Sequence, residues 1–176
     1  MSTGGGRPAI VQHHSTRKSS GKLIRAALRY LRKQDGRAAK RARAGLMSPD
    51  RLRHTFKGET PARKGYHYRP GGQDFPNRRI RQVIKRDPVT GVYEAKVEFF
   101  KNPPGQWMPK VGQGRSTFFP DHWTPAQVDE AVTSAFKGAT SKDPVKGVWK
   151  GEVNGVKIMG YYDTATGALK HGFPYL

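Results

Sequence analysis

Two histidines, His54 and His67, lie in the most basic part of the sequence, among lysines and arginines. Imidazole titrates near neutrality, so one histidine can accept a proton while a second donates one at the same pH. RNA transesterification needs such a pair: one imidazole takes the proton of the 2′-hydroxyl, and the other protonates the departing 5′-oxygen. A nearby cation stabilises the charge of the phosphorane. The two histidines are candidates for this pair, with phosphate-contacting or surface histidines as the alternative.

The positive charge is concentrated in the first half of the chain. Lys and Arg number 33 against 13 Asp and Glu, a net charge of +20. Residues 1–50 carry +10, residues 51–86 carry +9, and residues 87–176 carry only +1. Such an uneven distribution favours a surface that binds phosphates. For residues 1–45 a solvated basic tail is the alternative.

Several kinds of site are excluded or not indicated. The sequence has no cysteine, which excludes disulfides, thiolate zinc sites and cysteine nucleophiles. It contains no Gly-x-Ser-x-Gly elbow and no phosphate-binding loop, so no cofactor is predicted. Residues 51–86 offer only Glu59 and Asp74 as carboxylates, so no metal site is predicted. No apolar run approaches the ~20 residues of a membrane span, and we expect no stable membrane insertion.

Several short segments resemble a known family. Residues 53–59 (RHTFKGE) and 65–69 (GYHYR) are similar to the histidine-bearing opening of the bacterial EndoU ribonuclease domain, the tip of many polymorphic and contact-dependent toxins. Residues 116–124 (STFFPDHWT) resemble its phenylalanine-proline and tryptophan segment before a helix. The sequences GVKI and GY within residues 155–161, and GFP at 172–174, resemble its final strands.

The resemblance covers residues 50–176 and implies a metal-independent endoribonuclease that leaves a 2′,3′-cyclic phosphate. The fold it implies is α+β, a small curved antiparallel sheet packed on helices, as in RNase toxins of the barnase, EndoU, colicin and RelE types. His54 and His67 would be the acid–base pair, and Arg69 would lie near the family's catalytic lysine. Where the family often ends in Thr-x-Tyr-Pro, this chain has His171 in place of the threonine. His171 is therefore a candidate phosphate or base contact, with an incidental histidine as the alternative.

Further residues near these positions are expected to contact RNA. Cationic side chains pair with phosphates, and aromatic side chains stack on unpaired bases. Aromatic residues in strands also pack in cores, which is the alternative for the tyrosines. The predicted RNA-binding residues are Arg53, Lys57, Arg63, Lys64, Tyr68 and Phe173.

Residues 1–49 are predicted to form a basic N-terminal arm ahead of the ribonuclease domain, residues 50–176. Residues 1–20 lack periodicity and are predicted to be disordered. From residue 22 apolar side chains recur at helical spacing between basic ones, which predicts an amphipathic helix that Gly36 interrupts and residues 37–43 resume. The arm could grip RNA, lie on a membrane surface or act as a delivery linker. Alternatively, its apolar stripe packs on the domain.

Local signals predict the elements of the domain. The turn residues Asp87-Pro88-Val89-Thr90-Gly91 separate two strand-like segments and indicate a hairpin. Thr124 is a helix N-cap with Gln127 completing a capping box, and Gly138 is placed to end the same helix. Asn154-Gly155 indicates a second tight hairpin. The predicted strands are 80–85, 92–100, 147–153, 156–162 and 168–173.

These observations lead to the hypothesis of a monomeric endoribonuclease toxin that cuts tRNA or other cellular RNA. It would be a secreted or delivered bacterial effector acting in the cytoplasm of the target cell. Its producer would then need an immunity protein, and the +9 of residues 51–86 predicts an acidic one. A non-catalytic basic RNA-binding protein explains the charge equally well but leaves the paired histidines unexplained. A membrane-active effector is a third alternative, although residues 22–44 contain no Trp or Phe.

Overall fold

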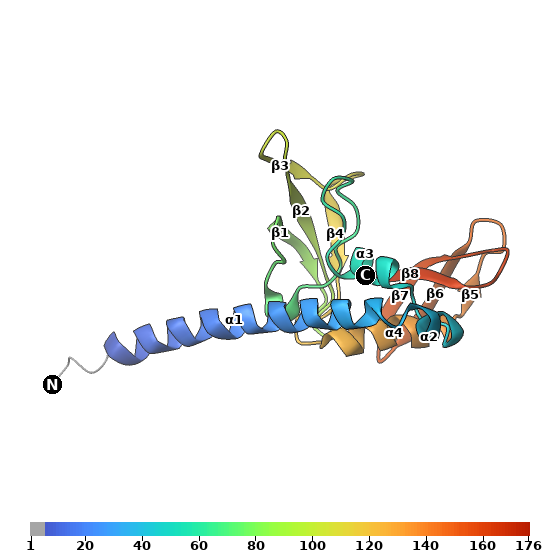
Figure 1. Cartoon of the computed structure of the whole chain (residues 1–176), viewed down its shortest axis with the longest axis horizontal. Helices are drawn as coiled ribbons and strands as arrows, with labels where there is room; N and C mark the ends of the chain where they lie inside the picture. Colours follow the sequence, from blue (N-terminus) through green and yellow to red (C-terminus); the bar gives the residue numbers. More distant parts are fainter. Residues whose placement is uncertain (1–5) are drawn as a thin grey trace.

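The structure is a computed structural model that describes residues 6–176 (Figure 1). Within these residues, four α-helices and one 3₁₀ turn, η2 (Pro70–Gly72), accompany two antiparallel sheets of four strands each. The predicted α+β class is confirmed, with two small sheets where a single sheet was expected. The buried apolar side chains of both sheets and of the helices belong to one continuous core.

The first sheet is built around its second strand. Its strands are β1 (Arg78–Arg86), β2 (Tyr93–Lys101), β3 (Gln106–Pro109) and β4 (Arg115–Phe118). β1 pairs with one edge of β2, and β3 and β4 pair with successive parts of the other edge. The predicted β1–β2 hairpin is confirmed, and the Asp87 carboxylate closes its turn by accepting a hydrogen bond from the Val89 N–H at 2.9 Å.

The second sheet is the predicted meander with one short strand added. Its strands are β5 (Ser141–Lys142), β6 (Val148–Val153), β7 (Val156–Tyr162) and β8 (Leu169–Pro174), hydrogen-bonded in that order. Asn154 and Gly155 both have positive φ, 51° and 79°, as a two-residue turn with the twist of the flanking strands requires. In the β7–β8 pair Tyr161 lies opposite His171, which brings the chain end to the edge of the candidate site.

Helix α4 (Pro125–Lys137) packs on the second sheet through the apolar face predicted from the sequence. The Thr124 hydroxyl accepts from the Gln127 N–H, and the Gln127 side chain accepts from the Thr124 N–H, so the capping box is confirmed. The helix and β6 approach closely at Gly151, where a Cβ atom would lie 2.2 Å from the Ala135 carbonyl oxygen. Only glycine allows this packing distance.

Helix α1 (Gly6–Asp35) begins well before the predicted start at residue 22. Of the segment expected to be disordered, residues 1–20, residues 1–5 lie outside the described part and the others are helical. Pro8 falls in the first turn, where the missing N–H costs no hydrogen bond. The next twelve residues contain neither Gly nor Pro, so each can extend a helix that has already formed. Figure 1 shows this end of α1 projecting beyond both sheets.

The C-terminal half of α1 packs on the domain, which was one of the alternatives for the arm. Ala27 and Leu31 are fully buried in the shared core, and Ile24 and Leu28 pack against it. The basic side chains between them remain exposed. None of the helices within residues 6–176 is long and apolar enough to cross a membrane.

A buried ion pair joins the arm to α4. Arg41, on α2 (Ala38–Arg43), binds both carboxylate oxygens of Asp129 at 2.7 and 2.8 Å, and the two side chains are only 4% and 1% exposed. The Tyr30 hydroxyl of α1 donates to the same carboxylate at 2.7 Å. The Arg41 guanidinium also donates to the Met47 carbonyl through Nε and to the Gln34 side chain through Nη1. Because the guanidinium and the carboxylate bind each other and have further hydrogen-bond partners, the pair can be buried without an unpaired charge.

Helix α3 (Pro49–Phe56) was not among the elements predicted from the sequence. Ser48 is its N-cap, accepting from the Arg51 N–H at 3.2 Å, and Pro49 occupies the first helical position. Both residue types are typical of a helix start, so a local signal for this helix was present in the sequence. The helix is short, and its Leu52 and Phe56 are buried in the core.

We predict that Arg41→Ala lowers the free energy of unfolding by about 3–5 kcal/mol, because Asp129 then keeps a buried charge without its main partner. Equilibrium urea unfolding of the full chain measures this change. Arg43→Ala is the matched control: Arg43 is exposed on the same short helix, and its loss should cost no more than about 0.5 kcal/mol. Equal effects of the two substitutions would contradict a stabilising role for the buried pair.

Candidate active site

The two histidines predicted from the sequence are positioned by the C-terminal end of α3. His54 lies in the last turn of this helix, whose final carbonyl groups have no partners within the helix. The backbone N–H groups of residues 66–68 donate in order to the carbonyls of residues 54–56, at 3.1, 2.7 and 3.2 Å. His67 is therefore held beside His54 by backbone hydrogen bonds.

The turn between the two histidines requires glycine at both of its ends. Gly58 and Gly65 have φ angles of 70° and 77°, which side chains rarely allow. A Cβ atom on Gly65 would lie 2.3 Å from the His54 carbonyl oxygen, and one on Gly58 would lie 2.3 Å from the Lys64 carbonyl oxygen. Gly58 and Gly65 belong to residues 53–59 and 65–69, the two segments compared above with a known family. Both glycines allow the close approach of the two backbones.

The His67 ring is buried, and its hydrogen bond determines the tautomer. Its Nδ1 lies 2.7 Å from the Thr117 carbonyl oxygen, which can only accept, so Nδ1 carries the hydrogen and Nε2 is left as the acceptor. The ring stacks on Phe173 with centroids 5.0 Å apart. Burial, together with the nearby charge of Lys110, holds the pKa of His67 well below the ordinary imidazole value.

Lys110 supplies the cation next to His67, and sequence reasoning missed it. Its Nζ donates to the Ser116 hydroxyl at 2.9 Å, and that hydroxyl lies 3.2 Å from the His67 Nδ1. Burial lowers the pKa of Lys110 to about 8. Lys110 follows β3 in a Pro- and Gly-rich connection within the nearly neutral half of the chain, so no local pattern distinguishes it from other lysines.

His54 faces a carboxylate on one side and a third histidine on the other. Its Nδ1 lies 3.3 Å from Glu59 Oε1, and its ring centroid lies 5.1 Å from that of His171. Burial lowers the pKa of His54, while Glu59 favours the charged form and opposes this shift. The structure thus brings His171, predicted as a site residue, next to His54.

His171 is held in its neutral form. Burial and the neighbouring His54 lower the pKa of His171 to about 4. The His171 Nδ1 is buried and has no hydrogen-bond partner among the described residues. The ring lies 5.3 Å from the ring of Tyr161 on the paired strand. A neutral imidazole with an unused ring nitrogen can make a hydrogen bond to a bound ligand.

These side chains surround one pocket of about 320 Å³. It opens between α3, the turn that follows it, β4 and the last two strands. Its lining combines three imidazoles with three cations and one carboxylate. The lining residues are His54, Lys64, Gly65, His67, Glu94, Lys110, Arg115, Ser116, Thr117, Tyr161, His171 and Phe173. The pocket can hold an anion next to groups that exchange protons near neutrality.

The family model described as Bacterial EndoU nuclease matches residues 49–176. This chain belongs to the bacterial EndoU nuclease family. No match is found among curated proteins. Family membership implies that the chain is a nuclease that cleaves RNA. Within the described residues, no three His, Cys, Asp or Glu side chains are arranged to hold a metal ion.

Two residues predicted for the site of this EndoU nuclease lie elsewhere. Arg69, expected near the catalytic lysine, instead binds Asp74 through its Nε at 2.8 Å and the Tyr93 hydroxyl at 3.2 Å, and it does not line the pocket. Tyr68, expected to contact RNA, is 1% exposed and donates its hydroxyl hydrogen to the Trp123 carbonyl. Internal partners already occupy the polar groups of both residues.

The other predicted RNA-binding residues divide into two sets. Lys64 and Phe173 line the pocket of the EndoU domain. Arg53 is held by two carboxylates, that of Asp35 at the end of α1 and that of Asp50 at the start of α3. Lys57 is partly buried at the end of α3, and Arg63 donates to the Pro109 carbonyl at 2.7 Å. These three cations are close in sequence to residues that line the pocket, but they do not line it themselves.

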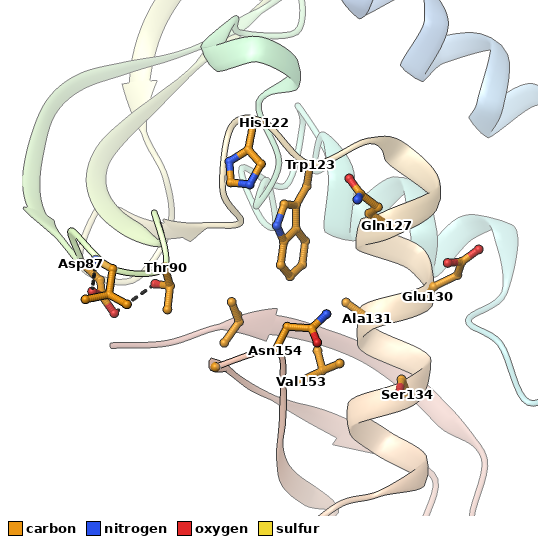
Figure 2. Close-up of a pocket in the computed structure, with 13 residues that line it drawn as sticks. Asp87, Thr90, His122, Trp123, Gln127, Glu130, Ala131, Ser134, Val153 and Asn154 are labelled. Atoms are coloured by element: carbon orange, nitrogen blue, oxygen red, sulfur yellow. Dashed lines mark hydrogen bonds between the residues drawn. The ribbon is translucent and has the colours of Figure 1, made fainter.

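A second, larger pocket of the EndoU nuclease lies elsewhere. It measures about 800 Å³ and lies between α4 and the hairpin turns of both sheets, with His122 and Trp123 directed toward it (Figure 2). Its only charged lining groups apart from histidine are the carboxylates of Asp87 and Glu130. A pocket with carboxylates and no Lys or Arg is poorly suited to phosphate, so its size does not make it the active site.

We predict that Lys110→Gln raises the pKa of His67, because it removes a like charge that opposes protonation of the ring while the site stays buried. An NMR titration of the histidine ring protons measures this pKa. Lys142→Gln on β5 is the control and should leave His67 unchanged, since Lys142 lies over the Phe136 ring outside the pocket. If the pKa of His67 fell or stayed constant in Lys110→Gln, the assigned electrostatic coupling would be wrong.

Proposed function

We propose that this EndoU nuclease cleaves RNA by transesterification without a metal ion and leaves a 2′,3′-cyclic phosphate. The observation that carries the proposal is the meeting of His54, His67 and Lys110 around one pocket. These groups supply a base, an acid and a cation, which are the three functions that the reaction needs.

His67 is the general base in this mechanism. Its Nδ1 hydrogen is donated to a backbone carbonyl, so its Nε2 lone pair is available to take the proton of the 2′-hydroxyl. The lowered pKa of His67 keeps the imidazole neutral at pH 7, as a base must be. The 2′-oxygen then attacks the adjacent phosphorus, and the bond to the 5′-oxygen breaks.

His54 is the general acid that protonates the leaving 5′-oxygen. Of the three histidines lining the pocket, it is the one with a carboxylate, Glu59, within 3.3 Å of a ring nitrogen. This carboxylate favours the protonated ring and, by binding Nδ1, directs Nε2 to the substrate. The two histidines thus differ in their neighbours, Lys110 for the base and Glu59 for the acid, and this difference supports the assignment.

Lys110 stabilises the negative charge that develops on the phosphorane. With a pKa of about 8, its ammonium group is mostly charged at pH 7. In a site that is partly shielded from water, a fixed positive charge stabilises an anionic transition state more strongly than it does in solution. Ser116, which accepts a hydrogen bond from the ammonium, keeps it close to His67.

His171 and Phe173 complete the substrate contacts. We assign His171 a hydrogen bond to phosphate or base rather than a charge, because its pKa of about 4 leaves it neutral at pH 7. Phe173 also lines the pocket, and it stacks on the ring of the general base His67 and thereby orients that ring. The basic side chains of Arg53, Lys57, Arg63 and Lys64 attract the RNA to this region.

The biological setting we propose is that of a delivered bacterial toxin. A nuclease with a net charge of +20 that attacks cellular RNA needs an inhibitor in the cell that makes it. An acidic immunity protein covering the pocket would bind rapidly, because opposite potentials speed association. Action in the cytoplasm of a target cell on tRNA or other RNA, as a monomer, is part of the same proposal.

We expect RNA cleavage to persist in excess EDTA and to leave cyclic phosphate ends, because the proposed reaction uses only protein side chains. Incubation of the purified protein with total RNA, followed by analysis of the fragment ends, tests this. DNA of the same sequence is the control and should remain intact, since it lacks the attacking 2′-hydroxyl. Fragments with 3′-hydroxyl ends, or activity that chelation abolishes and Mg²⁺ restores, would contradict the mechanism.

Single substitutions of His54 or His67 by alanine should lower the cleavage rate on the order of 10²- to 10⁴-fold, the usual contribution of a positioned acid or base. RNA affinity should change little, because the loss of one imidazole leaves the net charge of +20 in place. Single-turnover rates and filter binding measure the two quantities separately.

Lys110→Ala should reduce the rate by a similar factor, because the phosphorane then loses its cation. Arg69→Gln is the informative comparison: it lies outside the pocket, so the structure predicts a smaller effect on rate than for Lys110. Full activity in both histidine variants would show that the active site has been misplaced. Tight RNA binding without any cleavage by the parent protein would favour the non-catalytic binding protein.

A further inference from the structure

The face of the first sheet that points away from the core is continuous with the pocket. Directly paired residues of an antiparallel sheet share a face. In this sheet the pairs on the outer face are Glu94 with Thr117, Lys96 with Arg115, Glu98 with Pro109, Phe100 with Trp107 and, across to β1, Glu98 with Arg79. Glu94, Thr117 and Arg115 also line the pocket, so this outer face begins at the candidate active site.

Cations are in excess on the outer face. Arg79 and Arg81 both bind Glu98, whose side chain is 11% exposed, at 2.8 and 3.3 Å. The two arginine side chains remain 45% and 62% exposed, so they can bind a further anion. Arg81 and Lys96 line a hollow of about 410 Å³ in the middle of this face. The charge of the outer face therefore complements a phosphate backbone.

An aromatic platform lies at the far end of the outer face. Trp107 packs edge-on against Phe100, with centroids 5.4 Å apart, and the Arg79 guanidinium lies 4.2 Å from the centre of its ring. Trp107 is only partly buried. A cross-strand aromatic pair stabilises the hairpin. A partly exposed indole beside an arginine is also an arrangement on which unpaired bases can stack.

The platform is within reach of an RNA strand held at the pocket. Trp107 precedes Lys110 by three residues, which corresponds to ~10 Å at ~3.3 Å per strand residue. The outer face from Glu94 to Phe100 spans six residues of β2, or ~20 Å. A strand leaving the pocket along this face passes Lys96 and Arg81 before it reaches Trp107.

We propose that the outer face of the first sheet is a second RNA subsite, which binds the single-stranded flank of the cleaved RNA. The phosphates of this RNA flank bind Arg81, Lys96 and Arg115, and one of its unpaired bases stacks on Trp107. This inference rests on the proposed function, because it takes the pocket as the place of cleavage. The aromatic platform and its continuity with the pocket favour RNA over an acidic protein as the occupant.

The test compares a short and a long substrate in the full chain. A mixture of dinucleotides occupies only the pocket, whereas a single-stranded RNA of about ten nucleotides also covers the outer face. A 2′-O-methyl oligomer of the same length measures affinity without cleavage. Trp107→Ala should weaken binding of the oligomer and lower its kcat/KM by roughly 5- to 100-fold, the usual loss for one stacked base. Cleavage of the dinucleotides should stay constant.

The double variant R81Q/K96Q should weaken oligomer binding and reduce the log–log salt slope by about 0.7 for each lost phosphate contact. K142Q/K146Q removes the same charge from exposed positions at the edge of the second sheet, and it should leave both substrates unaffected. Trp107→Phe keeps an aromatic ring and should restore most of the affinity that Trp107→Ala loses.

The inference and the proposed function fail in different ways. Equal losses on dinucleotides and oligomer in Trp107→Ala, or no loss on the oligomer, would overturn the subsite. It would also be overturned if the outer-face variants lost affinity only for an acidic protein partner. A parent protein that cleaves neither substrate, yet binds the oligomer through Trp107, would support the subsite and refute the proposed cleavage.

Discussion

Three backbone hydrogen bonds, from the N–H groups of residues 66–68 to the carbonyls of residues 54–56, join the two catalytic candidates. A helix end leaves carbonyls without partners, and an extended segment here satisfies three of them in succession. The same segment is held from the other side, where the Phe119 N–H donates to the His67 carbonyl at 2.9 Å. His67 is thus held between α3 and β4 by backbone hydrogen bonds, which fix its position beside His54 without any substrate.

Burial gives the grouped side chains their different charge states. Three histidines and Lys110 lie around one pocket, and four positive charges at such separations would repel one another. Loss of hydration lowers the pKa of each of them, and Glu59 opposes this shift at His54 alone. Lys110 is therefore mostly charged at pH 7, whereas His67 and His171 are neutral. A pocket that combines the cations Lys64, Lys110 and Arg115 with imidazoles is suited to receive a phosphate diester and then to move protons around it.

The basic arm and the domain form one body along the C-terminal half of α1 and α2. The ion pair between Arg41 and Asp129 lies where these helices meet α4, and Ala27 and Leu31 extend the common core. The apolar stripe is used for packing, while the cations of the opposite face stay in solvent. The arm therefore holds its positive charges at a defined position on the domain.

The sequence alone determined the elements whose signals lie within a few residues. The capping box of α4 and the tight turns of both hairpins were predictable because their hydrogen bonds join near neighbours. The acid–base candidates His54 and His67 were also predictable, because each lies in a short basic segment that resembles a known family. Only the tertiary structure decided that Lys110, not Arg69, lies beside them, and that Tyr68 belongs to the core. Those outcomes depend on how β3, β4 and α3 pack together, and contacts between residues distant in sequence leave no local pattern from which they can be predicted.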